Sequence, residues 1–459
     1  GIDGMDARLT KHHLEAGKMP NLQTLIARGA AREDLRQLGA LPTITPPCWT
    51  TLATGAYPGT HGITCYWRQS PDSLDAVVYN MDSRNCRAEQ LWNITAEAGL
   101  KTLVWHWPGS SWPPTSDSPN LHVVDGTQPS NINIAVGTAE WGQWIEASTT
   151  IHDAHMAEKE ADDSGAGCVI SDLEIDEEGK QNGLDMSLKQ KVLTNMIMNE
   201  NEGECAGAAK PTLEEVKTTL PLKDASGWAD APADAKEFII PFSGGLTRRI
   251  ALLIPENGQY TKVQLYASKK ATEPLGEVSL GQGFSEWITD TAYTARGEEV
   301  DVAYKMRIYE MAADGSSLTL YITKSCQLKC DPKYFLPSTI GQELLDNIGP
   351  MVQASNIGRP NAEIGCDTWH EHYLWCADAI NYLLDNNPWD LFCCHLHSID
   401  CANHNMITDI VPESPRYERF YDILVQYYIN ADELLGKLMR HLDDGETAMF
   451  VVSDHAAVP

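Results

Sequence analysis

Three short stretches of the chain carry an aspartate that could bind a metal ion, and two of them also carry a histidine. Asp3 lies in the opening G-I-D-G, Asp400 is followed four residues later by His404, and Asp454 is followed directly by His455. Carboxylate and imidazole groups are good ligands for zinc or manganese. A single D-x-x-x-H spacing is more often incidental than functional. Three such sites, each at the end of an expected strand, together predict a metal centre.

A threonine at the start of an expected helix adds a hydroxyl group to this set. Thr45 stands directly before two prolines, and the helical stretch that follows runs to Gly55, which predicts Thr45 as the N-cap residue. A helix N-terminus stabilises an alkoxide and attracts a phosphate or sulfate. Because proline lacks an N–H, mainly the amides of Cys48 and Trp49 remain for an anion, so a metal ion would have to supply much of the charge. The alternative is that Thr45 only caps a buried helix.

An alternation of helices and apolar strands is expected to position these groups. Helices are predicted over 19–30, 88–100, 368–388 and 416–442, and apolar strands over 101–109, 389–400 and 447–455. This rhythm is typical of a doubly wound α/β sheet. Trp105, His106 and Trp107 lie at the C-terminal end of a strand, where such sheets bind ligands. They could line a pocket, although aromatic core packing is the commoner case.

The middle of the chain follows a different pattern. From about Asp125 onward, acidic segments containing glycine and serine surround one helix-like stretch at 185–199. Alternating runs then follow, separated by glycine-containing turns, and they predict antiparallel strands. These runs are EFIIPF, RRIALLIP, KVQLYAS, EVSL, DVAYKMRIYEM and SLTLYITK. The expected fold is therefore an α/β domain of residues 1–125 and 351–459, with a mostly parallel sheet and helices on both faces, interrupted by an inserted α+β domain at 126–350.

Composition narrows the class of protein. A chain of 459 residues is long enough for two or three domains. Its 42% hydrophobic and 21% charged residues are typical of a globular protein. No apolar run reaches the roughly 18 residues of a transmembrane helix. The formal net charge of −30 disfavours a nucleic-acid polymer as partner. The twelve cysteines are scattered, which favours mostly reduced thiols, although Cys326 and Cys330 could pair or form half of a metal site.

The order of the motifs resembles that of the type I phosphodiesterase/nucleotide pyrophosphatase family of the alkaline phosphatase superfamily. The motifs are GIDGMD, MPNL, PTITPPCWTTLATGAYPGTHGI, WPG, D-x-x-x-H and SDH, and they cover roughly residues 1–125 and 360–459. The resemblance implies an alkaline-phosphatase-like catalytic domain and two divalent metal ions, with zinc favoured over manganese. It places one ion on Asp3, Thr45, Asp454 and His455, and the other on Asp400, His404 and a further histidine. It also implies that Thr45 attacks phosphorus and forms a phosphothreonine, which water then hydrolyses.

Two departures from the family pattern bear on the site. Nucleotide-hydrolysing members usually carry an asparagine three residues after the threonine, where this chain has Cys48, a poorer hydrogen-bond donor. The final histidine ligand of the family follows S-D-H, so we expect it beyond Pro459. Among the histidines present, His397 is the first candidate for that role because it precedes Asp400 in the same strand and turn. His61 is expected to be structural, and the remaining candidates are His106, His395, His370 and His372.

The favoured function is a two-metal phosphohydrolase that acts on a small-molecule phosphodiester. The same ions would also suit phosphate monoesters, phosphonates and sulfate esters, because each presents a tetrahedral anion. Few cationic residues adjoin the metal motifs, which favours a diester over a dianionic monoester. A non-catalytic binding protein is the alternative class. Candidate substrate contacts are Cys48, Trp49, Trp105 and Trp107, and the inserted domain is expected to act as a cap that sets specificity.

Overall fold

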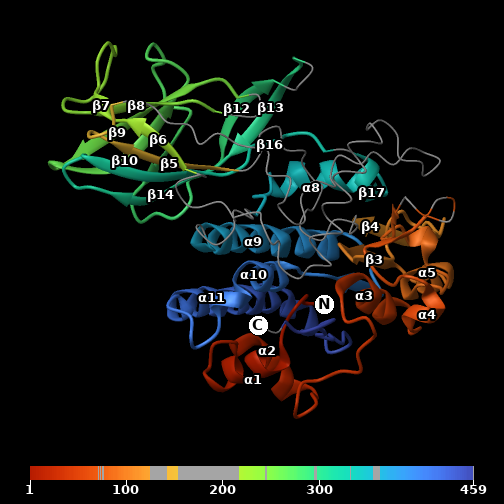
Figure 1. Ribbon diagram of the computed structural model, residues 1–459. Coiled ribbons are helices and arrows are strands. Elements are labelled where there is room, and N and C mark those ends of the chain that lie inside the picture. Colours follow the sequence, from red (N-terminus) through yellow and green to blue (C-terminus); the bar gives the residue numbers. More distant parts are fainter. Residues whose placement is uncertain are drawn as a thin grey trace.

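The computed structural model divides into a helix-rich α/β region and a region of antiparallel strands (Figure 1). It describes residues 1–70, 72, 74, 77–124, 142–152, 217–242, 246–293, 297–330, 332–354 and 362–457. The predicted helix at 185–199 lies outside these residues.

A four-stranded sheet forms the centre of the α/β region. Its order is β17 (Phe335–Leu336), β4 (Leu121–Val124), β3 (Thr102–Trp105) and β18 (Leu391–Cys394). β3 pairs in parallel with both β4 and β18, whereas β17 runs antiparallel to β4. Parallel pairing brings the carboxyl ends of β3, β4 and β18 to one edge of the sheet. The predicted mixed α/β fold is therefore confirmed, while the doubly wound order stays a prediction.

The first and last described segments extend this sheet beyond β18. Ile2 forms a parallel bridge with Leu396, and the Asp3 N–H donates to the Leu396 carbonyl at 2.8 Å. On its other side, the Ile2 N–H donates to the carbonyl of Val452 at 2.8 Å. The N and C markers accordingly lie close together in Figure 1. Segments from both ends of the chain thus enter one edge of the sheet beside the segment that leads to Asp400.

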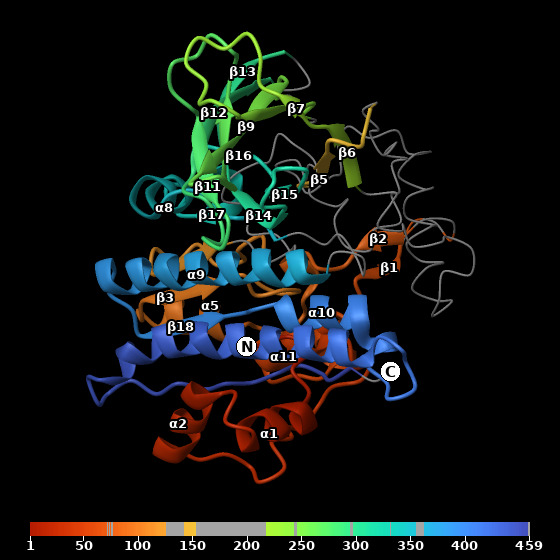
Figure 2. The ribbon, with the colours of Figure 1, turned by 90° about the vertical axis from the view of Figure 1, so that its left-hand side faces the viewer.

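One face of the sheet packs against the long helices. α9 (Ala362–Asn386) and α11 (Tyr417–Leu438) share a core with Leu103 and Trp105 of β3. Figure 2 shows α9 between the antiparallel strands and α11, with α1 and α2 beyond α11. The other helices on this side of the sheet are α1 (Ala7–Glu15), α2 (Pro20–Arg28), α8 (Ile340–Ile348) and α10 (Ser398–Met406).

The opposite face packs against two helices from the first hundred residues. α3 (Thr45–Thr54) and α5 (Leu91–Glu97) contribute Trp49 and Trp92 to a core that contains Val104. Val104 alternates along β3 with residues of the other core, as a strand covered on both faces requires. The short helix α4 (Pro58–His61) and the hairpin of β1 (Trp67–Gln69) and β2 (Val77–Tyr79) follow α3 in the chain.

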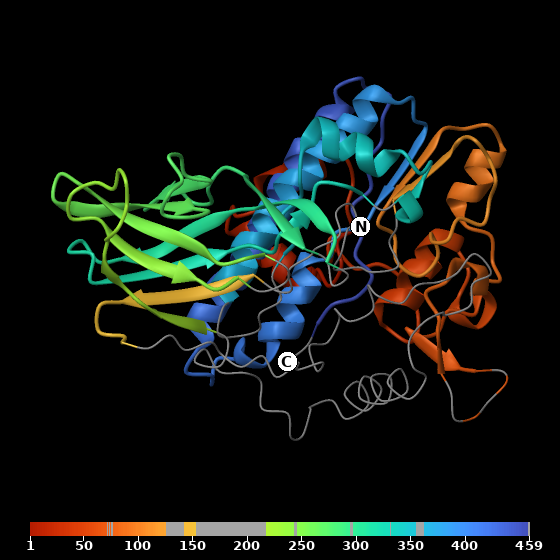
Figure 3. The same cartoon turned by 90° about the horizontal axis from the view of Figure 1, so that it is seen from above.

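The antiparallel region contains three sheets around one hydrophobic core, and Figure 3 shows it to one side of the helices. The sheet orders are β11-β10-β9-β8-β7, β14-β15-β5-β6 and β12-β13-β16. The strands are β5 (Gln143–Ser148), β6 (Lys217–Pro221), β7 (Lys223–Asp224), β8 (Lys236–Ile240), β9 (Arg249–Glu256), β10 (Gln259–Tyr266), β11 (Gly276–Ser279), β12 (Ile288–Tyr293), β13 (Glu299–Tyr304), β14 (Met306–Met311), β15 (Ser317–Ile322) and β16 (Cys326–Gln327).

The predicted strands occur where the alternating runs indicated, with two differences. The run DVAYKMRIYEM divides at Lys305 into β13 and β14, which belong to separate sheets. β5 and β6 pair in parallel, whereas antiparallel pairing was expected throughout.

Phe335 and the helix α8 pack into the α/β core, so chain contacts cross the expected boundary near residue 350. The division into domains at that residue stays a prediction.

Two further expectations concern the described residues as a whole. None of their helices is both long and apolar enough to cross a membrane. The ten described cysteines are free thiols, as the scattered pattern favoured. The Cys326 thiol donates to the Met351 carbonyl and the Cys330 thiol to the Gly341 carbonyl, so these two cysteines are not disulfide-bonded to each other.

Candidate metal centre

The turn after the first strand fixes Asp3 against the helix that carries Asp400. Gly4 has a φ of 66°, and a Cβ atom added to it would lie 2.8 Å from the Asp400 Cα. Glycine is therefore required for both the conformation and the close approach. The Gly4 N–H donates to Asp454 Oδ1 at 3.2 Å, and Asn403 Nδ2 donates to the Gly4 carbonyl at 3.0 Å. The peptide groups on the two sides of Gly4 thus link the three chain segments that carry the predicted ligands.

Asp454 and His455 meet Asp3 and Thr45 in one cluster. His455 Nε2 lies 3.3 Å from Asp454 Oδ2, 3.5 Å from Asp3 Oδ1 and 3.3 Å from Thr45 Oγ1. Ser453 supports this turn, because its hydroxyl accepts from the Met5 N–H and donates to the His455 carbonyl. The cluster thus brings three other predicted ligands, from distant parts of the chain, to within 3.5 Å of the His455 imidazole.

Asp400 and His404 lie on α10, which begins directly after the segment that continues β18. Their spacing of one helical turn places His404 Nε2 3.2 Å from Asp400 Oδ2, as D-x-x-x-H predicted. The His404 side chain is 76% exposed, so its imidazole faces solvent at the mouth of the cluster. His397 Nε2 lies 3.8 Å from the same Asp400 oxygen. Asp400 and His404 therefore form a second group beside the first.

Two histidines contact Asp3 from the strand side. His395 Nε2 lies 3.0 Å and His397 Nδ1 2.8 Å from the same oxygen, Asp3 Oδ2. His395 was only one of several candidate histidines in the sequence, and its contact with Asp3 was not predicted. The signal available was the spacing H-x-H directly after an apolar strand, which places both rings on one side of the backbone.

The helix start at Thr45 differs from the expectation. α3 begins at Thr45, Ile44 is the N-cap residue, and no side chain caps the helix. The Cys48 N–H donates to the Ile44 carbonyl at 3.2 Å, so the expectation that this amide is left for an anion was wrong. Gly55 ends the helix in the left-handed conformation, as predicted. Without a capping role, the Thr45 hydroxyl contacts His455 instead.

Buried negative charge dominates the electrostatics of this centre. Asp3, Asp400 and Asp454 are 0%, 3% and 4% exposed. Burial and the charge of Asp3 raise the pKa of Asp454 well above its usual range. Burial opposes ionisation of Asp3 too, but the hydrogen bonds with His395 and His397 hold its pKa well below the usual range. Burial lowers the pKa of His395 to about 4. A cation at this position would stabilise both carboxylates in their charged forms.

The candidate substrate contacts lie in the core. Cys48, Trp49, Trp105 and Trp107 are all buried. Trp107 donates its indole N–H to the Trp49 carbonyl, and the Trp49 ring packs edge-on against both Trp107 and His395. These contacts favour core packing for the aromatic residues, and a role in substrate binding stays a prediction.

The remaining candidate histidines take part in contacts outside the cluster. The His61 ring contacts Thr51 Oγ1 and accepts from the Ile63 N–H, in line with its expected structural role. His370 pairs with Glu433, and His372 is buried with its Nδ1 3.0 Å from the Val352 carbonyl oxygen. His106 is buried and has a φ of 61°. Of the candidates, His395 and His397 contact the predicted ligands.

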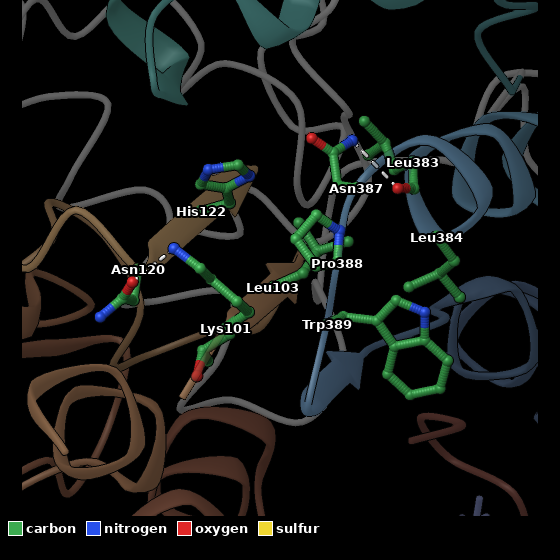
Figure 4. A pocket seen from close by; sticks show the side chains of 10 residues that line it. Lys101, Leu103, Asn120, His122, Leu383, Leu384, Asn387, Pro388 and Trp389 are labelled. Atoms are coloured by element: carbon green, nitrogen blue, oxygen red, sulfur yellow. Dashed lines mark hydrogen bonds between the residues drawn. The ribbon is translucent and has the colours of Figure 1, made fainter. Parts of the chain in front are cut away.

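A cavity of about 120 Å³ lies at the other end of the central sheet (Figure 4). It is lined by residues that precede or begin β3, β4 and β18, among them Lys101, Asn120, His122 and Trp389. The Lys101 ammonium donates to the Asn120 side-chain oxygen at 2.6 Å. None of the predicted metal ligands lines this cavity, so it is separate from the cluster at the carboxyl ends of the strands.

Comparison with known proteins identifies the family. The model of the type I phosphodiesterase/nucleotide pyrophosphatase family matches residues 1–194 and 290–459, well over half of the chain. No curated protein matches. One solved structure, a phosphonoacetate hydrolase from Sinorhizobium meliloti 1021 in complex with phosphonoformate, shares 28% identity over 22% of this chain and 24% of its own, with a TM-score of 0.21. By the family match, this chain belongs to the type I phosphodiesterase/nucleotide pyrophosphatase family, a member of the alkaline phosphatase superfamily.

Proposed function

We propose that this chain is a two-metal phosphohydrolase that cleaves a small-molecule phosphodiester through a phosphothreonine on Thr45. One observation carries the proposal. Asp3 Oδ1 and Asp454 Oδ2 are buried carboxylate oxygens without a hydrogen-bond partner, and both lie within 3.5 Å of His455 Nε2. A buried anionic oxygen without a partner is costly, and a metal ion is the natural group to satisfy it.

The residues present fit a divalent cation. The donor atoms of Asp3, Asp454 and His455 lie within 4.8 Å of one another, and Thr45 Oγ1 adds a fourth donor beside His455. Oxygen and nitrogen donors of this kind suit zinc, with manganese as the second choice. A second ion would be held by Asp400, His404 and a further histidine. When bound, such a pair lowers the pKa of a hydroxyl and neutralises phosphoryl oxygens.

Thr45 is placed to act as the nucleophile. Its side chain is buried in the first turn of α3, a helix held in the core by Trp49, so the hydroxyl has little freedom to leave the cluster. In the proposed reaction, Thr45 Oγ1 forms a bond to phosphorus as the bond to the leaving oxygen breaks. The proton of the Thr45 hydroxyl passes to solvent water, and the leaving oxygen takes up a proton from solvent. Water then attacks phosphorus from the side opposite Thr45 Oγ1 and gives one proton to that oxygen as its bond to phosphorus breaks, which releases a phosphate monoester and restores the hydroxyl.

Charge at the site favours a diester over a monoester. Among the described residues, the ion-pair partners recorded for Asp3, Asp400 and Asp454 are all histidines. A phosphate monoester carries a second negative charge and would gain from arginine or lysine contacts, which these carboxylates do not have beside them. Monoesters, phosphonates and sulfate esters remain the alternative substrates.

We also propose that residues 126–350 form a cap that sets specificity. Charged groups in and beside its strand β14 contact α9: Lys305, directly before β14, pairs with Glu371 at 2.7 Å, and Arg307 of β14 pairs with Asp367 at 3.2 Å. The Tyr309 hydroxyl also donates to Asp367 at 2.7 Å. A polar contact of this kind is typical of domains that move relative to one another.

The test combines metal analysis with a substrate panel. The purified chain, loaded with zinc or manganese, is assayed on bis-p-nitrophenyl phosphate and on nucleotide, glycerol and phospholipid diesters, beside a monoester, a phosphonate and a sulfate ester. We expect diester turnover, and phosphorylation of the Thr45 peptide after acid quenching, measured by mass spectrometry. A chain that retains metal but hydrolyses none of these esters would be a binding protein, and the enzyme proposal would fail.

A further inference from the structure

The two oxygens of Asp3 have different surroundings. Asp3 Oδ2 contacts two imidazole nitrogens, at 3.0 Å from His395 and 2.8 Å from His397. Asp3 Oδ1 has no hydrogen-bond partner and faces His455 and Asp454. One oxygen of the carboxylate is therefore held by the protein, while the other is left for the proposed cation.

The backbone explains why both rings reach the same oxygen. The segment after β18 pairs with the first residues through Leu396, whose N–H donates to the Gly1 carbonyl and whose carbonyl accepts from the Asp3 N–H. His395 and His397 flank Leu396, so their side chains leave the extended backbone on the same side. That side is the one on which Asp3 lies. The strand register, and not a flexible loop, sets both contacts.

The hydrogen-bond geometry assigns the donor nitrogen of each ring. His395 is fully buried, and its Nδ1 has no hydrogen-bond partner, which is tolerable for a bare acceptor but costly for an N–H donor. The proton of His395 therefore belongs on Nε2, where it donates to Asp3. His397 donates to the same oxygen through Nδ1 and turns its Nε2 toward Asp400.

We propose that His395 and His397 are positioning residues that clamp Asp3 Oδ2 and so fix Asp3 Oδ1 as a single, directed metal ligand. The inference rests on the proposed two-metal function. It differs from the alternative that Asp3, His395 and His397 bind a further cation themselves. Ligands of a tetrahedral ion with bonds of about 2 Å stand about 3.3 Å apart. The observed separations of 2.8 and 3.0 Å from Asp3 Oδ2 are instead ordinary hydrogen-bond lengths.

The test measures metal binding and not only turnover. Zinc affinity and the number of ions per chain are determined by competition with a chelator for the wild type, His395→Leu and His397→Leu. The conservative variants His395→Gln and His397→Asn restore a donor near Nε2 and near Nδ1, respectively. We expect each Leu variant to bind as many ions as the wild type at saturation, with about 10- to 100-fold lower affinity. The conservative variants should recover most of that loss.

The control is His372→Phe, because His372 is equally buried but contacts a backbone carbonyl outside the cluster. It should alter stability without changing zinc affinity. Loss of one ion per chain at saturating zinc in a Leu variant would overturn the proposal, because the histidine would then be a ligand. Unchanged zinc affinity in both Leu variants would also overturn it. If His395→Leu does not fold, His397→Leu, whose native side chain is 11% exposed, decides alone.

These outcomes are independent of the substrate panel. A wild-type chain that binds two ions but cleaves no ester would end the proposed function while the zinc affinities still support the clamp. A chain that cleaves a diester, but whose zinc affinity does not respond to His395 or His397, would keep the function and end the clamp.

Discussion

The two regions of the molecule bury carboxylates in opposite ways. In the antiparallel region, Asp290 receives two hydrogen bonds from Arg249, at 2.9 and 2.5 Å, and a third from the Tyr304 hydroxyl at 2.8 Å. In the α/β region, Asp3 and Asp454 are also buried, but their ion-pair partners among the described residues are histidines, and each keeps one oxygen without a hydrogen-bond partner. The first arrangement satisfies the carboxylate with cationic and hydroxyl donors and is structural. The second leaves carboxylate oxygens that could bind the proposed cation.

Loss of the nucleophile should produce the largest effect. Thr45→Ala is expected to lower kcat by several decades, because the covalent route requires the hydroxyl, while the fold stays intact. Turnover of bis-p-nitrophenyl phosphate is the measurement, and Thr45→Ser, which keeps a hydroxyl, is the matched control. More than about a tenth of the wild-type kcat in Thr45→Ala would contradict the covalent mechanism.

Breaking the pair of Arg249 and Asp290 should affect stability but not metal binding. Asp290→Ala leaves the Arg249 guanidinium buried without its partner, which we expect to lower the free energy of unfolding by about 3–5 kcal/mol. Urea denaturation measures this change. Zinc should not restore the lost stability, and the zinc content of the folded protein should equal that of the wild type. If Asp290→Ala is as stable as the wild type, the pair of Arg249 and Asp290 does not stabilise the fold as proposed.

Removal of a carboxylate of the metal centre should change metal content. We expect Asp400→Ala and Asp454→Ala each to bind fewer zinc ions per chain, because each removes a charged ligand. Elemental analysis after dialysis against dilute zinc gives the stoichiometry, and Asp290→Ala serves as the control. Unchanged zinc content in either variant would remove that residue from the metal centre.

The smallest expected effect is on the pH dependence of stability, and it concerns His372, a buried histidine outside the metal centre. Burial lowers the pKa of His372 to about 4 from its usual 6.5, so its neutral form is favoured in the folded state. The stability it contributes is present above about pH 6.5 and is lost as the pH falls toward 4. At pH 5.5 the loss should be on the order of 1 kcal/mol. His372→Asn keeps a donor for the Val352 carbonyl but does not titrate, so its urea midpoint should fall less between pH 7 and 5.5. Identical pH dependence would refute this assignment.

The sequence predicted that the candidate metal-binding residues lie close together. It did not predict which of their atoms contact one another. Asp3, Asp400 and Asp454 were expected to meet because each follows an expected strand, and they do lie together. The predicted strand at 447–455 is not formed, however, and Asp400 lies in the first turn of α10. The contact between His395 and Asp3 depends on strand register, which hydrophobic pattern does not specify to the residue. The first turn of α3 was misjudged because Ile44, which lacks a capping side chain, takes the cap position.

In the antiparallel region, too, the sequence pattern predicted strands better than it predicted how they pair. Alternating residues and glycine turns located seven of its strands, because both signals are local. They did not predict β5, β6, β7, β12 or β16. The parallel pairing of β5 with β6 joins segments that are separated by undescribed residues, and no local signal selects that partner. The division of one run at Lys305 likewise depends on which sheet each half joins.

Gly4, the glycine beside Asp3, limits how far the segments of this centre can move relative to one another. Since the distance from a hypothetical Gly4 Cβ to the Asp400 Cα is 2.8 Å, the gap between the first turn and α10 is narrower than a methyl group. Any variation that widens it would move Asp400, Asp454 and the Asn403 contact at the same time, since all three lie against Gly4. In laboratory evolution of new specificities, we therefore expect substitutions at residues around the centre, while position 4 stays glycine.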